Sequence, residues 1–386
     1  MKHIVILGST GSIGASTLDI VSRFPDHFAI LGLTAGTNDE KLEQQIRTFH
    51  PRVVALSSET AAQRLRARLT NHPVEILSGE KGLCTVASAP DSDLVISAIV
   101  GGSGLMPTMA AIRAGRAVAL ANKEPMVMAG QMMQEEAHKQ GKRIFPIDSE
   151  HSAVFQSLEG HRKQDVRRIM LTASGGPFWN WSVDQMKHVT PDQALQHPNW
   201  KMGAKITIDS ATMMNKGLEV IEARWLFDVP PNQIEMVIHR ESIIHSLVEY
   251  CDGSVIAQLG FPDMRTPIAY ALNYPERISL EPPLLDLGKI GNLTFYPSDF
   301  EKFPCSKLAY EALEGGGGLP ATLNAANEIA VQAFLNNEIA FLDISRLIRD
   351  TMNAYTPHAL TTIEDALEID RWAREKASVL VKAFTK

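Results

Sequence analysis

Residues 4–14 of the chain read Ile-Val-Ile-Leu-Gly-Ser-Thr-Gly-Ser-Ile-Gly, an apolar run that leads into regularly spaced glycines. Residues 15–24 then read as a helix that Pro25 closes. A strand, a glycine turn and a helix in this order form the phosphate-binding opening of a dinucleotide fold, because glycines let the backbone approach a pyrophosphate and the helix N-terminus faces its charge. The spacing is GxxGxxG and not GxGxxG, so a tight turn in another α/β unit is the alternative interpretation.

Apolar strands continue to alternate with helices beyond this turn. We predict strands at residues 28–33, 53–56, 74–77, 94–100, 117–120 and 143–146. Strands this apolar are buried on both faces, which indicates a parallel sheet covered by helices. Residues 34–38, which follow the second strand, read Thr-Ala-Gly-Thr-Asn. The carboxylate that would bind a ribose hydroxyl is missing there, so the sequence favours NADP over NAD.

The pattern changes after Glu150. We predict a strand at residues 205–208, followed by a helix that Asp209 or Ser210 caps. Strands at 234–238, 243–250 and 254–259, the last two joined by a hairpin turn signal, indicate antiparallel pairing and an α+β domain.

The last part of the chain reads as helices that follow a proline-rich segment. The final helix is expected to open with a capping box from Thr361 to Glu364. The fold class that we predict is therefore α/β, with a Rossmann-like NADP-binding domain, a central α+β catalytic domain and a C-terminal all-α helical bundle.

Composition narrows the classes of function. The 386 residues carry a formal net charge of -7, which argues against a nucleic-acid-binding protein. The three cysteines lack a CxxC spacing, so neither a disulfide framework nor a zinc ribbon is indicated, and a reducing cytoplasmic location fits best. No apolar run reaches the length of about eighteen residues that a membrane helix requires.

Asp148-Ser149-Glu150 follows the last strand predicted for the sheet. Two carboxylates at a strand end can point oxygens at one cation, and ligands of open α/β sheets bind at this edge. The alternative is an acidic turn in which Ser149 caps the next helix. Lys123, also just past a strand, is either a contact to substrate or nicotinamide or part of an exposed helix start. His151, one residue past these carboxylates, is either a partner that supports them or, as we favour, a helix-start histidine without a role.

A second polar group lies on the helix that we predict from residue 209 onward. Asn215, Glu219 and Glu222 recur at +4 and +3, and such a stripe is usually a solvated face. Lys216 lies near the positive end of the helix and suits a phosphate. Glu219, one turn later, suits a metal.

Two loop segments carry further candidate binding groups. Residues 174–178 read Ser-Gly-Gly-Pro-Phe, and the amides and hydroxyl of this turn suit an anion, although an isolated turn of this kind is more often structural. Residues 197–203 read His-Pro-Asn-Trp-Lys-Met-Gly. Trp200 there belongs either to a lid over a ligand or to the local core.

Together, these motifs resemble the 1-deoxy-D-xylulose 5-phosphate reductoisomerase family along essentially the whole chain. The resemblance rests on residues 8–14, 121–124, 148–151, 174–178, 197–203 and 210–219, which occur in this order. It implies an NADPH- and divalent-metal-dependent enzyme that converts 1-deoxy-D-xylulose 5-phosphate to 2-C-methyl-D-erythritol 4-phosphate in non-mevalonate isoprenoid biosynthesis. A skeletal rearrangement precedes the hydride reduction. The resemblance also implies a homodimer and a small phosphorylated sugar as substrate.

The resemblance further implies site residues. The metal ligands would be Asp148, Glu150 and Glu219, and this all-oxygen set suits Mg²⁺ or Mn²⁺, with Co²⁺ as a further option, but not zinc. Lys123 would join these ligands as a catalytic residue. The substrate contacts would be Lys123, Ser149, Glu150, Ser174, His197, Trp200, Met202, Ser210, Asn215, Lys216 and Glu219, with Trp200 and Met202 in a closing flap. The cofactor contacts would be Gly8, Thr10, Gly11, Ser12, Ile13, Gly36, Asn38, Asn122, Glu124 and Gly203.

The expected domain boundaries follow from the same reading. They are an NADPH-binding domain at 1–148, a central catalytic, metal-binding and dimerisation domain at 149–273, an extended linker at 274–304 and a helical domain at 305–386. Two positions depart from the family pattern. Thr37 stands where many members carry a lysine beside the 2′-phosphate, and His239-Arg240-Glu241 stands where His-Pro-Gln is expected.

Two other functions are compatible with the motifs. An NADP-dependent dehydrogenase of another small substrate, with purely structural carboxylates, predicts activity that is independent of metal. A nucleotide-sensing binding module with a helical interaction domain predicts binding without turnover. The carboxylate, hydroxyl and lysine groups listed above argue against the sensor, which would not need them.

Overall fold

The structure is a computed structural model that describes residues 1–70, 72–200, 202–356 and 360–384. The chain folds into two compact units. The first consists of Met1–Pro125, Met133–Ser149 and Met264–Glu281, and the second of Met126–Met132, Glu150–Asp263 and Pro282–Lys386. Each unit has a sheet and a hydrophobic core of its own. The division of the chain into four segments stays a prediction.

The first unit contains a seven-stranded sheet in the order β4-β3-β2-β1-β5-β6-β7, in which every neighbouring pair is parallel. Its strands are β1 (Lys2–Leu7), β2 (Phe28–Ala35), β3 (Val53–Leu56), β4 (Glu75–Ser78), β5 (Leu94–Ser97), β6 (Ala117–Leu120) and β7 (Ile144–Pro146). The strand order reverses between β1 and β5, and ligands of such sheets bind at this switch point. The predicted parallel, Rossmann-like sheet is confirmed.

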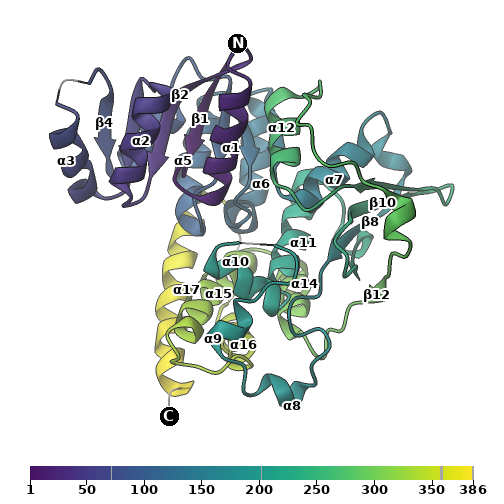
Figure 1. The fold of residues 1–386 in the computed structure, drawn as a ribbon. Helices are drawn as coiled ribbons and strands as arrows, with labels where there is room; N and C mark the ends of the chain where they lie inside the picture. The colour runs from purple at the N-terminus through teal and green to yellow at the C-terminus, as the bar shows by residue number, and fades with distance from the viewer. Residues whose placement is uncertain (71, 201, 357–359, 385–386) are drawn as a thin grey trace. The chain divides into compact units, whose positions relative to one another are not determined.

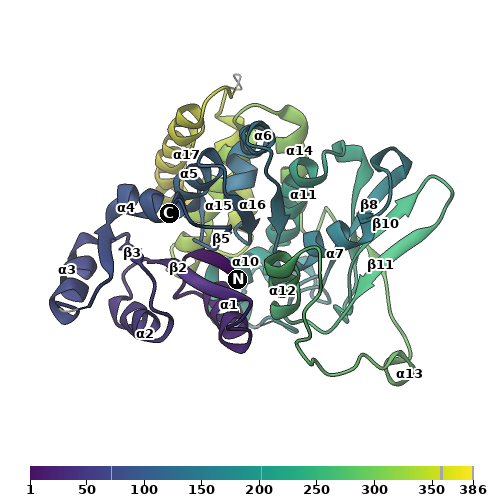
Figure 2. The ribbon, with the colours of Figure 1, turned by 90° about the horizontal axis from the view of Figure 1, so that it is seen from above.

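Helices cover both faces of this sheet. They are α1 (Ser12–Arg23), α2 (Asp39–Phe49), α3 (Glu59–Arg68), α4 (Gly79–Ala87), α5 (Leu105–Arg113) and α12 (Arg265–Asn273), with a short 3₁₀ turn η1 (Gly102–Gly104). Figure 2 shows α1 and α2 on one face and α4 and α5 on the other. Strand residues such as Ile4, Leu33 and Ile96 are fully buried between these layers, as expected for apolar parallel strands.

The second unit contains a five-stranded sheet in the order β11-β10-β8-β9-β12. Its strands are β8 (Val166–Ala173), β9 (Ile234–Ile238), β10 (Ile244–Tyr250), β11 (Val255–Leu259) and β12 (Tyr296–Pro297). Only the β8 and β9 pair is parallel among these neighbours, which confirms the predicted α+β character. β12 and α13 (Leu287–Ile290) lie in the segment that we expected to be an extended linker, so that segment is not uniformly extended.

Helices of the second unit pack against this sheet and against one another (Figure 1). They are α7 (Ser149–Leu158), α8 (Val183–Met186), α9 (Pro191–Ala194), α10 (Ala204–Ala211), α11 (Met214–Phe227), α14 (Pro304–Gly315), α15 (Leu319–Leu335), α16 (Asp343–Asn353) and α17 (Ile363–Phe384), with 3₁₀ turns η2 (Lys163–Asp165) and η3 (Pro231–Gln233). α6 (Glu124–Lys139) contributes residues to both units. Among the described residues, no helix has the length and apolar character needed to cross a membrane.

Two local predictions are wrong. Residues 205–208 belong to the helix α10 and not to a strand. The alternation of Ile206 and Ile208 resembles a strand, but the Lys205 and Asp209 side chains form an ion pair of 2.8 Å one helical turn apart. Asp209 therefore lies inside a helix and does not cap α11, which begins after Met213 in the left-handed region at φ 63°.

The capping box of α17 is shifted by one residue from the prediction. The Thr362 hydroxyl accepts from the backbone N–H of Asp365 at 3.0 Å, and the Asp365 carboxylate accepts from the N–H of Thr362 at 2.8 Å. Aspartate performs here the role that we expected of Glu364.

Candidate active site

The glycine turn joins β1 to α1 in the first unit, and two of its glycines are sterically required. Gly8 has a φ of +85°, and a Cβ there would lie 2.6 Å from the carbonyl oxygen of Ala98. A Cβ at Gly14 would lie 2.5 Å from the backbone of Ser9. α1 begins after Gly11 without a side-chain cap, so its first amides can bind a phosphate.

The start of α2 is tied to this glycine turn. Asn38 caps α2 by accepting from the backbone N–H of Lys41 at 3.0 Å. The Lys41 ammonium donates to the carbonyl oxygen of Thr10 at 2.9 Å. Gly36 and Thr37, between β2 and this cap, are exposed. The predicted cofactor residues from the glycine turn and from the end of β2 are thus joined through one lysine.

Asp39 is the first acidic residue after β2, and its carboxylate is engaged by other side chains of the protein. It is buried and forms ion pairs with Arg64 and Arg68. The hydrogen bond from Arg64 outweighs burial and holds the pKa of Asp39 far below its ordinary value. Because this carboxylate is occupied by two guanidinium groups, it does not replace the ribose-binding acid that the sequence lacks.

The segments after β6 and β7 bring two predicted site residues together in the first unit. The Lys123 ammonium, which is buried, forms an ion pair with the carboxylate of Asp148. Asn122 fixes the turn before Lys123, because its amide donates to the carbonyl of Gly101 at 3.0 Å and its carbonyl accepts from the N–H of Glu124 at 3.2 Å. Lys123 is therefore part of a buried pair and not an exposed helix start.

Two predicted metal ligands meet in the second unit. Glu150 lies in the first turn of α7 and Glu219 in the second turn of α11, and both accept hydrogen bonds from the Lys216 ammonium. The distance from Lys216 Nζ to Glu150 Oε1 is 2.7 Å. Asn215 also donates to Glu219, at 2.6 Å. We call Glu150, Lys216 and Glu219 the carboxylate cluster.

The Lys216 ammonium at the centre of the carboxylate cluster is charged although it is buried. Burial lowers the pKa of Lys216, but the charges of Glu150 and Glu219 outweigh it, and the pKa is raised overall. Glu219 is 0 % exposed and Glu222 is buried as well, so this stripe is not the solvated face that such a spacing usually indicates. Two carboxylates that converge on one cationic group offer the hard oxygen ligands that a divalent metal needs, and the residues therefore fit such an ion.

His151 is bonded to the helix that carries Glu219, and whether it has a role at the site stays a prediction. The His151 ring is fully buried, and its Nε2 lies 2.9 Å from the carbonyl oxygen of Glu219. Its Nδ1 lies 3.5 Å from Glu222 Oε2. The side chain thus links α7 to the backbone of α11 at the residue that carries a predicted metal ligand.

A second group forms at the turn after β8. The Ser174 hydroxyl lies 3.2 Å from His197 Nε2 and accepts from the N–H of Gly176 at 3.2 Å. Nδ1 of His197 accepts from the N–H groups of Asn199 and Trp200 at 3.2 and 2.9 Å. Burial, and secondarily the charge of Arg240, lower the pKa of His197 to about 4. His197 is therefore neutral near pH 7, with its proton on Nε2.

Other predicted substrate residues lie on the elements beside this turn. A Cβ on Gly176 would lie 2.6 Å from the carbonyl oxygen of Ser210, so the turn packs directly on α10. Trp200 is half-buried, with its ring centroid 6.5 Å from that of His245. Gly203 is the N-cap of α10, and Met202 is half-buried just before it. Lys201, quoted with this motif, lies outside the described residues.

Three family models match the chain. They are the 1-deoxy-D-xylulose 5-phosphate reductoisomerase model at residues 4–130, the C-terminal domain model of that enzyme at 144–227 and a DXP reductoisomerase C-terminal domain model at 259–376. A reductoisomerase of this name from Geotalea uraniireducens is 55% identical over 381 residues, with 99% of each chain covered. The chain belongs to the 1-deoxy-D-xylulose 5-phosphate reductoisomerase family.

Solved reductoisomerase structures agree with this assignment. The enzyme from Zymomonas mobilis in complex with NADPH has a TM-score of 0.93 and 43% identity, and it covers 99% of both chains. A reductoisomerase in complex with NADPH, fosmidomycin and magnesium has a TM-score of 0.95 and 42% identity over 100% of both chains. A second sequence relative, from Geobacter metallireducens, is 56% identical over 381 residues. The predicted family and fold class are confirmed, and both alternative functions lose their support.

Arg240 is a residue at this reductoisomerase site to which we assigned no role from the sequence. Its guanidinium Nη1 donates to the carbonyl oxygens of Ser174 and Gly176, the latter at 2.9 Å. The sequence did mark this position, because Arg240 stands where the family pattern has a proline. Nothing in the local pattern indicated which turn it would contact.

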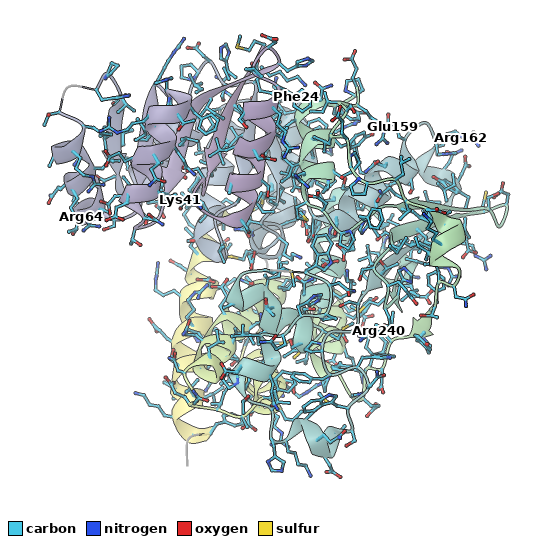
Figure 3. All side chains as sticks on the ribbon, in the orientation of Figure 1. Phe24, Lys41, Arg64, Glu159, Arg162 and Arg240 are labelled. Carbon is cyan, nitrogen blue, oxygen red and sulfur yellow. The ribbon has the colours of Figure 1, made fainter. Side chains whose placement is uncertain are left out.

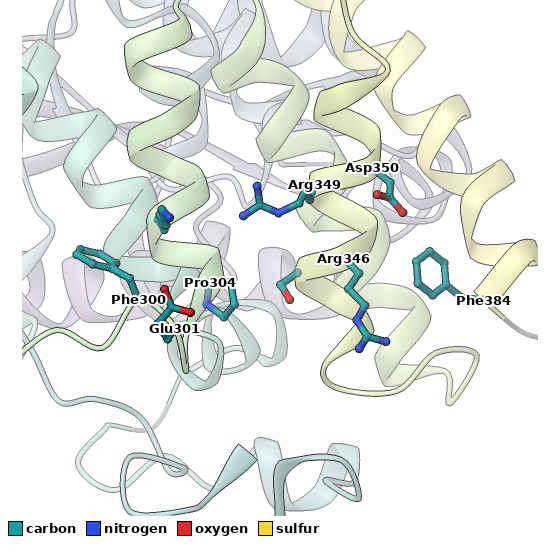
Figure 4. Close-up of a pocket in the computed structure, with 9 residues that line it drawn as sticks. Phe300, Glu301, Pro304, Arg346, Arg349, Asp350 and Phe384 are labelled. Atoms are coloured by element: carbon teal, nitrogen blue, oxygen red, sulfur yellow. The ribbon is translucent and has the colours of Figure 1, made fainter. Parts of the chain in front are cut away.

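A surface pocket of about 520 Å³ lies elsewhere in the second unit (Figure 4). It is lined by Phe300, Glu301, Pro304, Lys307, Ser345, Arg346, Arg349, Asp350 and Phe384, none of which is a predicted site residue. Two of its cations are already paired, Arg346 with Asp343 and Arg349 with Glu311, both at 3.2 Å. We assign this pocket no part in the reaction.

Proposed function

We propose that the chain catalyses the NADPH-dependent conversion of 1-deoxy-D-xylulose 5-phosphate to 2-C-methyl-D-erythritol 4-phosphate. The observation that carries this proposal is the carboxylate cluster, in which Glu150 and Glu219 converge on the position of one cationic group. A plain dehydrogenase needs no such group, whereas the family's reaction requires a Lewis acid to rearrange the carbon skeleton.

Asp148, Glu150 and Glu219 would hold the divalent metal. When bound, Mg²⁺ or Mn²⁺ supplies polarisation of the substrate's ketone and stabilisation of negative charge on its oxygens. Co²⁺ is a further option with the same ligands. The Lys216 ammonium, which neutralises Glu150 and Glu219 here, would release both carboxylates to the ion. His151 would hold the α11 backbone at Glu219 through this exchange.

The phosphate of the substrate would bind between the turn after β8 and the start of α11. Ser174, His197, Ser210 and Asn215 supply hydroxyl, imidazole and amide groups, and the released Lys216 supplies charge. Hydrogen bonds to a charged phosphate contribute on the order of 1.5 to 3 kcal/mol each, and this remote binding energy would close the flap that contains Trp200 and Met202. Closure excludes water from the reacting carbons. Ser149 and Lys123 would contact the substrate beside the metal ligands.

The cofactor would bind at the glycine turn and the end of β2. The first amides of α1, which begins without a side-chain cap, would face a pyrophosphate. The predicted contacts are Gly8, Thr10, Gly11, Ser12, Ile13, Gly36, Asn38, Asn122, Glu124 and Gly203. NADPH supplies the hydride. The occupied carboxylate of Asp39 supports the preference for a 2′-phosphate over a free ribose hydroxyl. We further propose a homodimer that acts in the cytoplasm.

The deciding experiment follows NADPH oxidation with 1-deoxy-D-xylulose 5-phosphate, with and without a chelator. We expect turnover that the chelator abolishes and added Mg²⁺ or Mn²⁺ restores. Activity that persists after complete chelation would support a metal-independent dehydrogenase instead. NADPH binding without any turnover, in the presence of metal, would support a sensor.

A further inference from the structure

Arg240 lies in the short loop between β9 and β10, and the loop is held rigidly. The buried ring of His239 accepts from the N–H groups of Ile243 and Ile244 at 3.2 and 3.1 Å through Nε2. Its Nδ1 donates to the carbonyl of Thr294 at 3.0 Å. The carboxylate of Glu241 accepts from the Thr294 hydroxyl at 2.7 Å. Hydrogen bonds therefore hold the loop on both sides of Arg240.

The guanidinium of Arg240 contacts the turn after β8. Its bonds to the carbonyl oxygens of Ser174 and Gly176 span a turn in which Gly176 has a φ of +68°. Two bonds from one guanidinium nitrogen to carbonyls two residues apart hold the curvature of the turn. Within the same turn, the amide of Gly176 donates to the hydroxyl of Ser174 at 3.2 Å.

The predicted flap is attached to the same loop. The side-chain amide of Asn199 donates to the carbonyl of Arg240 at 2.9 Å and to the hydroxyl of Ser242 at 2.8 Å. His197, two residues earlier, lies 3.2 Å from the Ser174 hydroxyl. Arg240 therefore lies between the Ser174–Gly176 turn and the segment that contains the predicted flap.

The charge of Arg240 is offset only in part, by an electrostatic interaction with the carboxylate of Glu241. Among the described residues, Arg240 forms no ion pair, and its guanidinium hydrogen bonds go to neutral carbonyl groups. Burial lowers its pKa, but an arginine with half-buried carbons still carries its charge near neutral pH. The charge also reaches His197, whose pKa it lowers. A half-buried cation that forms no ion pair among the described residues, beside a turn that carries hydroxyl and amide groups, attracts an anion.

We propose that Arg240 is a positioning residue for the substrate's phosphate: it shapes the Ser174–Gly176 turn and adds a positive charge beside it that no ion pair among the described residues neutralises. This inference rests on the proposed binding of the phosphate at Ser174. The class of ligand is a dianion on a small polyol, either a phosphate monoester or a phosphonate. The reacting carbons and the hydride are not touched by Arg240, so its effect belongs to binding and flap closure.

The test compares Arg240→Met, Arg240→Lys and the control Arg162→Met in the full-length enzyme. Arg162 is an exposed residue of the same unit that pairs only with Asp165 among the described residues, and it lies far from Arg240 (Figure 3). We expect Arg240→Met to raise KM for 1-deoxy-D-xylulose 5-phosphate about tenfold, as loss of a charge interaction in a partly solvated site implies. kcat at saturation should change much less, and Arg240→Lys should restore part of the affinity.

Two binding measurements separate this role from a general loss of structure. The dissociation constant of inorganic phosphate, measured by calorimetry, should rise in Arg240→Met, while that of NADPH should stay as in the unmodified enzyme. The salt dependence of KM should also become shallower in this variant, because one charge is gone. Unchanged KM, phosphate affinity and salt dependence in Arg240→Met would overturn the proposal.

A Ser174→Ala variant distinguishes this failure from failure of the proposed function. If Ser174→Ala weakens phosphate binding and Arg240→Met does not, the inference about Arg240 alone is wrong. If neither variant affects phosphate binding while turnover persists, the phosphate does not bind at this turn. Absence of turnover in the unmodified enzyme with its metal would contradict the proposed function itself.

Discussion

The glycine turn of the first unit and the carboxylate cluster of the second unit are built in opposite ways. The turn is a continuous stretch between β1 and α1, and its geometry follows from where a Cβ has no room. The cluster joins Glu150 to Lys216, which are 66 residues apart, at the first turns of two helices. The comparison teaches that backbone sterics create an anion site locally, whereas a buried charge site needs tertiary packing to neutralise each group.

The largest effect is expected from a substitution in the carboxylate cluster. Glu219→Gln should lower turnover by about 100-fold or more at a fixed Mg²⁺ concentration, because an amide is a poorer metal ligand and removes one charge that stabilises Lys216. NADPH affinity, measured by fluorescence, should be kept. Glu235→Gln, an exposed carboxylate on β9 that pairs with Arg168, is the matched control. Turnover that equals the control's would remove Glu219 from the metal site.

The sequence was sufficient for the first unit because its signals are local. Apolar runs predicted the parallel strands, and the glycines predicted the turn at Gly8 that joins β1 to α1. The hairpin joining β10 and β11 was predicted for the same reason. In each case, the residues that decide the structure are neighbours in the chain, so spacing alone carries the information.

The second unit resisted the same reasoning because its decisive contacts are between distant residues. Glu222 belongs to a stripe with the spacing of a solvated face, yet it is fully buried beside His151. Residues 205–208 alternate like a strand and form a helix, since Asp209 is held by Lys205 and by Asn327 of α15 at 2.8 Å. Spacing shows which residues share a face but not what covers that face.

A steric test of the glycine turn is expected to have the next largest effect. Gly14→Ala should lower the free energy of unfolding of the first unit by about 1 to 3 kcal/mol, because its Cβ would overlap the backbone of Ser9. Gly11→Ala, where the nearest atom lies 3.4 Å away, is the matched control and should cost less than about 1 kcal/mol. The measurement is urea unfolding of the enzyme without cofactor. Equal losses in both variants would show that Cβ contacts do not decide the turn.

A pH titration should show the difference between a buried imidazole and an ordinary one. His197 should stay neutral until the pH falls to about 4, because burial and then the Arg240 charge lower its pKa from the ordinary value of 6.5. Between these two pH values the unfolded chain binds the proton more readily, so His197 makes the fold less stable as the pH falls. Histidine ring NMR measures the midpoint, and Arg240→Met should raise it. A midpoint near 6.5 would contradict the lowered pKa and the burial that causes it.

The smallest effect is expected near the glycine turn, at the end of β2, where the chain carries Thr37 instead of a lysine. Thr37→Lys should tighten NADPH binding by about threefold to fivefold and leave NADH binding unchanged, because an exposed ammonium gains only modest energy from a solvated 2′-phosphate. Thr85→Lys, which adds the same charge on the exposed side of α4, is the control. Fluorescence titration at two salt concentrations measures both effects. If NADH tightens equally, the new charge acts on the pyrophosphate at the glycine turn, and the 2′-phosphate does not lie beside Thr37.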